Sequence, residues 1–291
     1  MRKILKRLYH KLPVSAALKV RLKAALPYSL QEPNPSLRRF GTVDDLYPWR
    51  AEGGLDTRLF VQNYFSYFFP GLDTATEVHL WLNDAGGRPL GRKIVPLARM
   101  QTSDISVQKW LNELGRAEKS GTLLWHVVLP PSVAAFSADQ HAYFTDRGYI
   151  AFVKDGVQPS FMHGIDRYAV FQERETETED RFYPEGASFS WRPEIPLGPG
   201  LGCESLDVMT VNRSEKPVTL ELLVLDGAGT VVDTRKRTVP ARGLYLETLE
   251  GTLLSRLADR GCLRVSGLPT PWSRVMVLRH CPGGSVSPMH C

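Results

Sequence analysis

The chain has 291 residues, of which 43% are hydrophobic and 23% charged, a composition typical of folded globular proteins with room for two domains. No run of 18 apolar residues occurs, so the sequence predicts no membrane-spanning helix. Eight basic residues and no acid lie in residues 1–31, whereas the remainder holds 28 basic and 31 acidic residues. This distribution argues against a nucleic-acid-binding body and predicts a basic arm that meets an anionic partner.

Residues 1–40 are predicted to form this basic arm as short amphipathic helices. Ile4 and Leu8 begin an apolar pattern at helical spacing, which Pro13 interrupts and which resumes up to Pro27. Such helices can lie on an anionic membrane; the alternative is that their leucine face packs on the body. Because the arm lacks the uninterrupted apolar stretch of a secretory signal, we expect a cytoplasmic protein, held peripherally at the inner membrane if the arm binds lipid.

An internal repeat follows the arm. Trp49-Arg50-Ala51-Glu52 matches Trp191-Arg192-Pro193-Glu194, which lies 142 positions later. At the same offset, VHLWLNDAGG matches LELLVLDGAG, and each is an apolar strand followed by the Asp/Gly chemistry of a tight turn. Further along, 149–156 is matched with 273–280, and both halves close on Ser-x-Met-His, at His163 and His290. The pattern predicts an all-β fold of two tandem homologous β-sandwich domains preceded by short basic amphipathic helices.

The two units are unequal in length and in aromatic content. The predicted boundaries are 41–171 for unit one, 172–190 for an acidic linker and 191–291 for unit two. Unit one carries an insert at 131–148, which adds 15 residues relative to unit two. It also carries the aromatic run 64–69 where unit two is matched with 206–211. Long loops on rigid scaffolds often carry function, so unit one is predicted to hold the binding surface.

Two resemblances to known families add expectations. The stretch LDVMTVNRSEKPVTLELLVLDGAGTVVDTRKRTVPARGLYLETLE resembles the small β-sandwich of the sensory rhodopsin transducer family in its succession of strands and turns. The N-terminal segment LYHKLPV, continuing into LKVRLK, resembles the start of bacterial glycosyltransferases and neighbouring proteins of surface-polysaccharide gene clusters. The second resemblance implies a role in assembling a surface glycan.

The leading hypothesis is a non-catalytic protein that binds a glycan or a glycan-assembly enzyme through unit one. Aromatic faces suit sugar rings, and polar neighbours fix their orientation. The candidate ligand-binding residues are Tyr64, Tyr67, His141, Tyr143, Phe144, Arg147 and His163. The alternative is a structural role, in which the insert covers an otherwise exposed sheet face and buries its own aromatic side chains.

Other functions remain open at this point. A hydrolase or transferase would use His163, His141 and Asp146, provided that these groups converge on one cleft. A self-assembling structural protein would form homo-oligomers through its sheet edges. No cofactor is expected, and a tetrahedral zinc site is a minority alternative on His280, Cys281, His290 and Cys291. The Trp-Arg-x-Glu motifs are expected to cap each sandwich, with sugar stacking by the tryptophan as the alternative.

Overall fold

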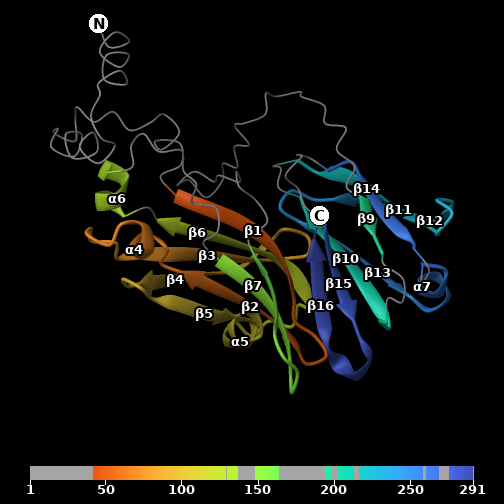
Figure 1. The fold of residues 1–291 in the computed structure, drawn as a ribbon. Helices are drawn as coiled ribbons and strands as arrows, with labels where there is room; N and C mark the ends of the chain where they lie inside the picture. The colour runs from red at the N-terminus through yellow and green to blue at the C-terminus, as the bar shows by residue number, and fades with distance from the viewer. Residues whose placement is uncertain are drawn as a thin grey trace, which may run out of the picture.

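The computed structural model describes residues 42–128, 130–136, 148–163, 194–197, 202–212, 216–257, 260–268 and 275–290. Their dominant element is the β-strand, arranged in four antiparallel sheets of four strands each (Figure 1). The predicted all-β class is therefore confirmed. The predicted basic arm and linker lie outside the described residues.

Unit one contains two sheets, which we name 1A and 1B. Sheet 1A has the order β1-β6-β3-β4, and sheet 1B has the order β5-β2-β7-β8. The strands are β1 (Thr42–Arg50), β2 (Leu55–Gln62), β3 (Thr76–Asp84), β4 (Pro89–Leu97), β5 (Thr102–Ser106), β6 (Ser120–Val128), β7 (Gly148–Lys154) and β8 (Ser160–His163). Three helices accompany them: α4 (Phe65–Phe68), α5 (Val107–Glu113) and α6 (Pro131–Phe136).

Unit two repeats this arrangement in sheets 2A, of order β9-β14-β11-β12, and 2B, of order β13-β10-β15-β16. The strands are β9 (Glu194–Pro196), β10 (Ser205–Val211), β11 (Val218–Leu225), β12 (Val231–Val239), β13 (Leu244–Glu250), β14 (Cys262–Ser266), β15 (Met276–His280) and β16 (Val286–His290). Helix α7 (Gly251–Leu257) and the short helix η1 (Pro282–Gly284) complete it. Each strand of unit one has its counterpart eight strands later, so the two units share one strand order.

The matched Asp/Gly turns form identical hairpins. In β3–β4, the Asp84 amide donates to the Arg88 carbonyl over 2.9 Å, and in β11–β12 the Asp226 amide donates to the Thr230 carbonyl over 2.9 Å. Gly87 has φ 78° and Gly229 has φ 79°, a left-handed conformation that glycine adopts without steric cost. The repeat is therefore reproduced down to the dihedral angles of its turn.

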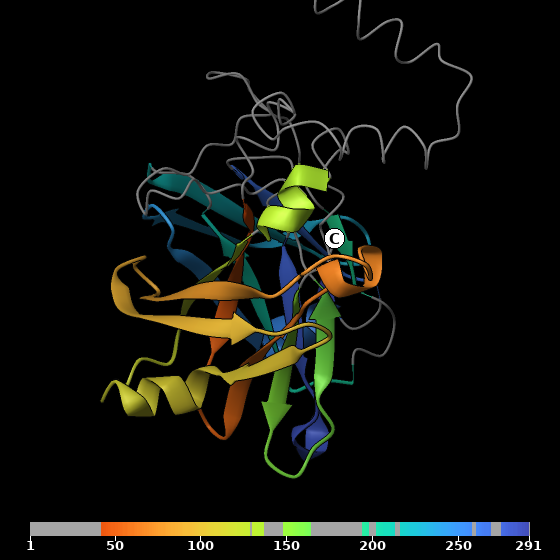
Figure 2. The same cartoon turned by 90° about the vertical axis from the view of Figure 1, so that its left-hand side faces the viewer.

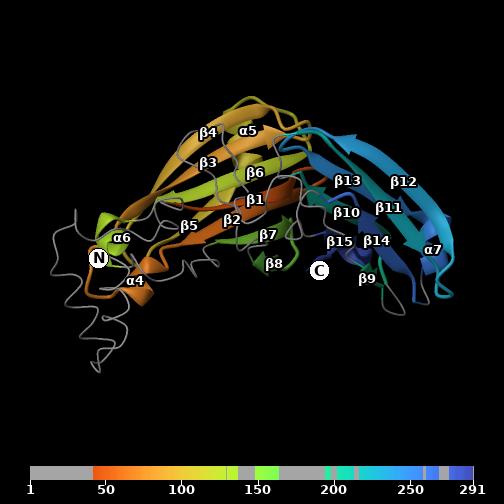
Figure 3. The same ribbon diagram turned by 90° about the horizontal axis from the view of Figure 1, so that it is seen from above.

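The two units pack side by side through an apolar junction. Figure 3 shows them as two halves of an arch, in which sheet 2B of unit two faces unit one. β10 lies against β1, and β13 lies against β6. Met209 and Leu278 of sheet 2B belong to the same buried cluster as Leu46 of unit one, so the core of unit one continues into unit two.

The register corrects two of the sequence matches. Tyr47 of β1 pairs with Leu123, and Ile195 of β9 pairs with Leu263, its counterpart. β9 therefore lies 148 positions after β1, and the matched Trp-Arg-x-Glu motifs are out of register by six residues. Likewise β10 corresponds to β2, which lies 149 positions earlier, and not to residues 64–69. Strand register is set by ladder hydrogen bonds and by the buried face, which outweigh a four-residue motif with three identities.

The aromatic run 64–69 is itself an insertion. It includes α4 and lies between β2 and β3, where the chain advances 15 positions from Asn63 to Val78. In unit two it advances only 8, from Asn212 to Leu220. The equivalence of the two asparagines is clear, because each side-chain amide donates to backbone carbonyls at the end of the next hairpin.

The insert between β6 and β7 also differs from its predicted form. Its first residues form α6 and its last residue, Gly148, begins β7, while residues 137–147 lie outside the described part. The chain advances 27 positions from Leu123 to Ile150 but 14 from Leu263 to Val277, so the insertion adds 13 residues and not 15. The match of 149–156 with 273–280 is accordingly wrong by three residues.

Trp49 has the structural role expected of its motif. Its side chain is fully buried, and its Nε1 donates to the carbonyl oxygens of Asn83 (3.1 Å) and Thr122 (3.2 Å). Arg50 pairs with Glu52 at the end of β1. Because no face of the Trp49 ring is open, its sugar-stacking alternative is wrong. No helix in the described ranges is long and apolar enough to cross a membrane.

Candidate functional site

The outward face of sheet 1B presents aromatic and polar side chains. β2 alternates between buried and half-buried residues along its whole length, as expected for a strand with one face in the core. Leu59 and Val61 point into the core, so Arg58, Phe60 and Gln62 must stand on the opposite, outward face.

Three aromatic rings from different strands meet on this face. Phe60 of β2 pairs with Tyr149 of β7, and Phe161 of β8 stands diagonally beside them, opposite Ala151. The rings of Phe60 and Phe161 lie 5.4 Å apart between centroids and are tilted by 53°. Tyr149 is 36% and Phe161 56% exposed, which is high for aromatic side chains within a sheet. A row of exposed rings marks a surface built for contact with another molecule.

Tyrosines of the α4 segment extend this row at the end of β2. Tyr67 is 55% exposed, and its hydroxyl accepts a hydrogen bond from Gln62 Nε2 over 3.0 Å. The hydroxyls of Tyr64 and Tyr149 lie 3.0 Å apart. Both tyrosines therefore fold back onto the face of sheet 1B. We call Phe60, Tyr64, Tyr67, Tyr149 and Phe161 together the aromatic face.

The two insertions of unit one meet at this end of the sheet. Ser132 of α6 donates a hydrogen bond to the carbonyl oxygen of Asp73, in the loop that follows α4. Phe65 of α4 and Val133 of α6 are both fully buried, so each insertion is anchored in the core. Figures 1 and 2 show α4 and α6 close together at one end of unit one. Both features that distinguish unit one from unit two thus border the aromatic face.

One ion pair stands beside the rings. Arg58 holds Asp104 of β5 through two contacts, with Nε to Oδ1 at 2.9 Å. The guanidinium carbon of Arg58 lies 5.9 Å from the centroid of the Phe60 ring, so cation, anion and ring form one group. At the far end of the face, Asp56 accepts from Ser106 Oγ (2.6 Å) and from the Gln108 amide (2.9 Å). Burial raises the pKa of the Asp56 carboxyl.

The corresponding face of unit two is aliphatic and buried. The register places Met209 at the position of Phe60, Met276 at that of Tyr149 and Leu278 at that of Ala151. Met209 and Leu278 are completely buried and Met276 is 1% exposed, because all three pack in the junction. Unit two therefore buries in the junction the face that is exposed in unit one.

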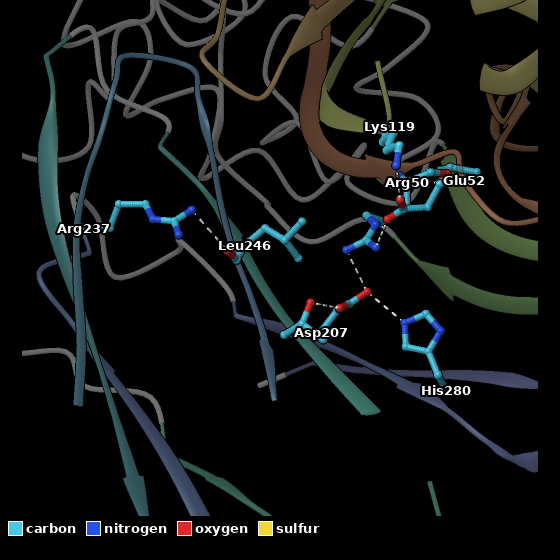
Figure 4. Close-up of polar contacts among 9 residues, drawn as sticks. Arg50, Glu52, Lys119, Asp207, Arg237, Leu246 and His280 are labelled. Atoms are coloured by element: carbon cyan, nitrogen blue, oxygen red, sulfur yellow. Dashed lines mark hydrogen bonds and ion pairs between the residues drawn. The ribbon is translucent and has the colours of Figure 1, made fainter. Parts of the chain in front are cut away.

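A buried polar cluster sits in the junction (Figure 4). Asp207, at the position of Arg58, lies 2.9 Å from Arg50 Nη1 of unit one. The Asp207 carboxylate also lies 2.8 Å from His280 Nε2 and accepts from Thr248 Oγ1 over 2.7 Å. Although burial pushes the pKa of Asp207 upward, the hydrogen bond to His280 and the charge of Arg50 hold it below its usual range. The cluster joins β1 to sheet 2B.

The predicted ligand-binding residues fall into three groups. Tyr64 and Tyr67 lie on the aromatic face. His163 ends β8 opposite Tyr149, so its backbone borders the same face. His141, Tyr143, Phe144 and Arg147 lie outside the described residues, as does Asp146 of the catalytic alternative.

The zinc alternative has no support in the register of β15 and β16. His290 pairs with Met276, whereas His280 lies at the other end of the strand, opposite Val286. At about 3.3 Å per residue, four residues separate the two histidines by roughly 13 Å. Cys281 is a free thiol, Cys291 lies outside the described ranges, and within those ranges no three His, Cys, Asp or Glu residues group as metal ligands.

Sequence reasoning missed most of the aromatic face. Phe60, Tyr149 and Phe161 come from three strands that only the fold brings together. One signal was available in the sequence: Arg58, Phe60 and Gln62 occupy the polar phase of an alternating strand, where a phenylalanine is out of place. A second was the replacement of Pro288 in unit two by Phe161 in unit one.

Comparisons with known proteins give no family. No family model matches the chain, and no curated protein is significantly similar to it. Among solved structures, a β-glucuronidase of glycoside hydrolase family 2 matches with 12% identity and a TM-score of 0.20, over 86% of this chain and 23% of the enzyme.

Two further solved structures are similar at the same level. One is a glycosyl hydrolase family 2 member from Bacteroides cellulosilyticus, at 10% identity and TM-score 0.20, covering 91% of this chain and 31% of that one. The other is a calcium-binding mutant of a Bacteroides uniformis β-glucuronidase, at 11% identity and a TM-score of 0.18, covering 84% of this chain and 25% of that one. The chain thus spans about a quarter to a third of the length of these proteins. TM-scores this low establish neither a shared fold nor a shared activity.

Proposed function

We propose that the protein is a carbohydrate-binding protein in which unit one holds a glycan on the aromatic face. The observation that carries the proposal is the row of Tyr67, Tyr149 and Phe161, which are all at least 36% exposed on one side of the molecule. Aromatic rings stack on the apolar faces of sugar rings, and the loss of water from both surfaces stabilises the complex.

Polar groups beside the rings support a saccharide ligand over a purely apolar one. Gln62 and the Arg58–Asp104 pair supply amide, guanidinium and carboxylate groups at the edge of the rings. These groups offer both donors and acceptors, which hydroxyl groups of a sugar need.

The cellular setting is part of the proposal and rests on the sequence. The N-terminal resemblance favours a role in assembling a bacterial surface polysaccharide, and the eight basic residues of 1–31 favour attachment to an anionic membrane surface. A protein without catalytic activity fits a binding face of this kind. The competing enzyme would need His141 and Asp146 to join His163 at the border of the face.

The test is a binding measurement on full-length protein with the ring pair removed. A library of immobilised bacterial surface polysaccharides first identifies a bound glycan, and calorimetry then compares wild type with Tyr149→Ala Phe161→Ala. We expect the double variant to bind at least about tenfold more weakly, because each stacked ring adds roughly 0.5–1.5 kcal/mol beyond its buried area.

Ile94→Ala provides the matched control. Ile94 is 49% exposed on β4 of sheet 1A, so the substitution removes an exposed apolar side chain from another face. It should leave glycan affinity unchanged. Unaltered affinity in the double variant would contradict the proposal, as would capture of a protein partner but no glycan through the same residues.

A further inference from the structure

The cation beside the aromatic face is paired with a carboxylate. Among the described outward positions of sheet 1B, Arg58 is the single lysine or arginine, and Asp104 already holds it through two contacts. The other ionisable acid on this face is Asp56, whose carboxylate is satisfied by Ser106 and the Gln108 amide. His163 stands at the border, opposite Tyr149.

We propose that the aromatic face selects a neutral glycan chain and rejects an acidic one, with the Arg58–Asp104 pair as the selecting element. This inference rests on the proposed function and names its ligand class. An acidic sugar approaching Phe60 would find the Arg58 guanidinium already neutralised by Asp104, and the further carboxylate of Asp56 stands at the far end of the face. Like charges in a partly desolvated contact oppose binding, whereas a neutral sugar meets no such barrier.

The same pair suits the hydroxyl groups of a neutral sugar. Arg58 carries donors and Asp104 carries acceptors, held side by side and next to the Phe60 ring at 5.9 Å. A ring stacked on Phe60 or Phe161 would present neighbouring hydroxyls to one donor and one acceptor at once. The orientation of the pair is fixed by its two contacts, so little conformational freedom is lost on binding.

The experiment compares polysaccharides that share a backbone and differ in charge. The probes are hydroxyethyl cellulose with carboxymethyl cellulose, dextran with dextran sulfate, and methyl-esterified with de-esterified homogalacturonan. Affinity electrophoresis of the full-length wild type is expected to show tighter binding to the neutral member of whichever pair binds. Asp104→Asn leaves Arg58 without its counter-charge, so the ratio of the two dissociation constants should shift about tenfold toward the anionic member, or 1.4 kcal/mol.

Asp233→Asn is the control, because Asp233 holds Arg235 at 3.0 Å on β12 of unit two, away from the face. It should not alter the ratio. Tighter, salt-sensitive binding of wild type to the anionic member would overturn the neutral ligand class while leaving a glycan-binding function in place. An unchanged ratio in Asp104→Asn would overturn the role of the ion pair. Binding of wild type to neither member of any pair, nor to any other glycan, would overturn the proposed function itself.

Discussion

Sheet 1B of unit one and sheet 2B of unit two have the same strand order and opposite uses. At equivalent outward positions, unit one has Phe60 and Tyr149 where unit two has Met209 and Met276. The first pair belongs to an exposed face and the second is buried in the junction. The backbone is common to both, so the side chains on one phase of the strands decide whether a face meets solvent or a neighbouring domain.

The difference also shows what each unit contributes. Both insertions of unit one border its exposed face, and in unit two the corresponding connections are short. Unit two instead offers an aliphatic surface and a buried carboxylate, Asp207, to unit one. Unit two therefore packs one face of sheet 2B against unit one, whereas unit one leaves the equivalent face of sheet 1B exposed.

The largest effect is expected from Asp207→Ala, which would remove the buried carboxylate that Arg50 and His280 contact in the junction and leave Arg50 paired only with Glu52. Removing one member of a buried ion pair costs about 3–5 kcal/mol in unfolding free energy. Chemical denaturation monitored by tryptophan fluorescence measures it. The charge-reducing change Arg50→Met Asp207→Leu should recover much of the loss, and an Asp207→Ala protein of unchanged stability would contradict the buried cluster.

A matched pair of substitutions tests the two faces at one equivalent position. Met276→Ala removes a buried side chain and should cost about 2–5 kcal/mol, whereas Tyr149→Ala removes an exposed one and should cost far less. Both are measured by thermal unfolding under one set of conditions. Equal losses would mean that the aromatic face is covered, and that the contrast between the units is wrong.

Substitutions at the two equivalent turn glycines distinguish the cost of packing at the junction from the cost of backbone strain in the hairpin. Gly87 and Gly229 have the same left-handed φ, so alanine at either costs roughly 1–2 kcal/mol in backbone strain. A Cβ at Gly87 would also lie 2.2 Å from the Ala241 carbonyl oxygen of unit two, whereas a Cβ at Gly229 would have no heavy atom within 4 Å. Gly87→Ala should therefore be the more destabilising of the two in urea titrations. Equal values would argue against close packing of the units at this hairpin.

The smallest expected effect is a decrease in the unfolding free energy at acidic pH. Because the pKa of Asp207 is lower in the folded protein than the ordinary value of 3.8, its carboxylate stabilises the fold fully above that pH. The stabilisation is lost as the pH falls from 3.8 through the folded pKa. Unfolding free energies between pH 5 and 3 should fall less steeply in Asp207→Asn than in wild type; parallel curves would exclude this contribution.

Local patterns in the sequence predict much of the fold and little of the junction. The alternation in β3 and the Asp84–Gly87 turn identify a hairpin, because strand period and turn chemistry are local properties. Register is not local, which is why matching the Trp49 motif by its three identical residues misplaced it by six positions. In β10, whose sequence LDVMTV contains Asp207 and Thr210, burial extends to both faces, unlike the alternating burial of β2.

The candidate site divides in the same way. Tyr64 and Tyr67 were found because aromatic residues cluster in one loop of unit one but not in unit two. Tyr149 and Phe161 were missed because their neighbours on the face lie on β2, far away in the sequence. An outward phenylalanine in an alternating strand is the sequence feature that would reveal such a face.

Hydroxyl-radical footprinting, with and without a bound neutral polysaccharide, tests the central contrast most directly. Tyr67, Tyr149 and Phe161 should react in the free protein and become protected by the glycan. Met209 and Met276 should stay unreactive throughout, whereas Met100, which is 49% exposed, should react in both states. Rings that stay fully reactive with glycan bound, or Met209 and Met276 reacting as fast as Met100, would contradict the account.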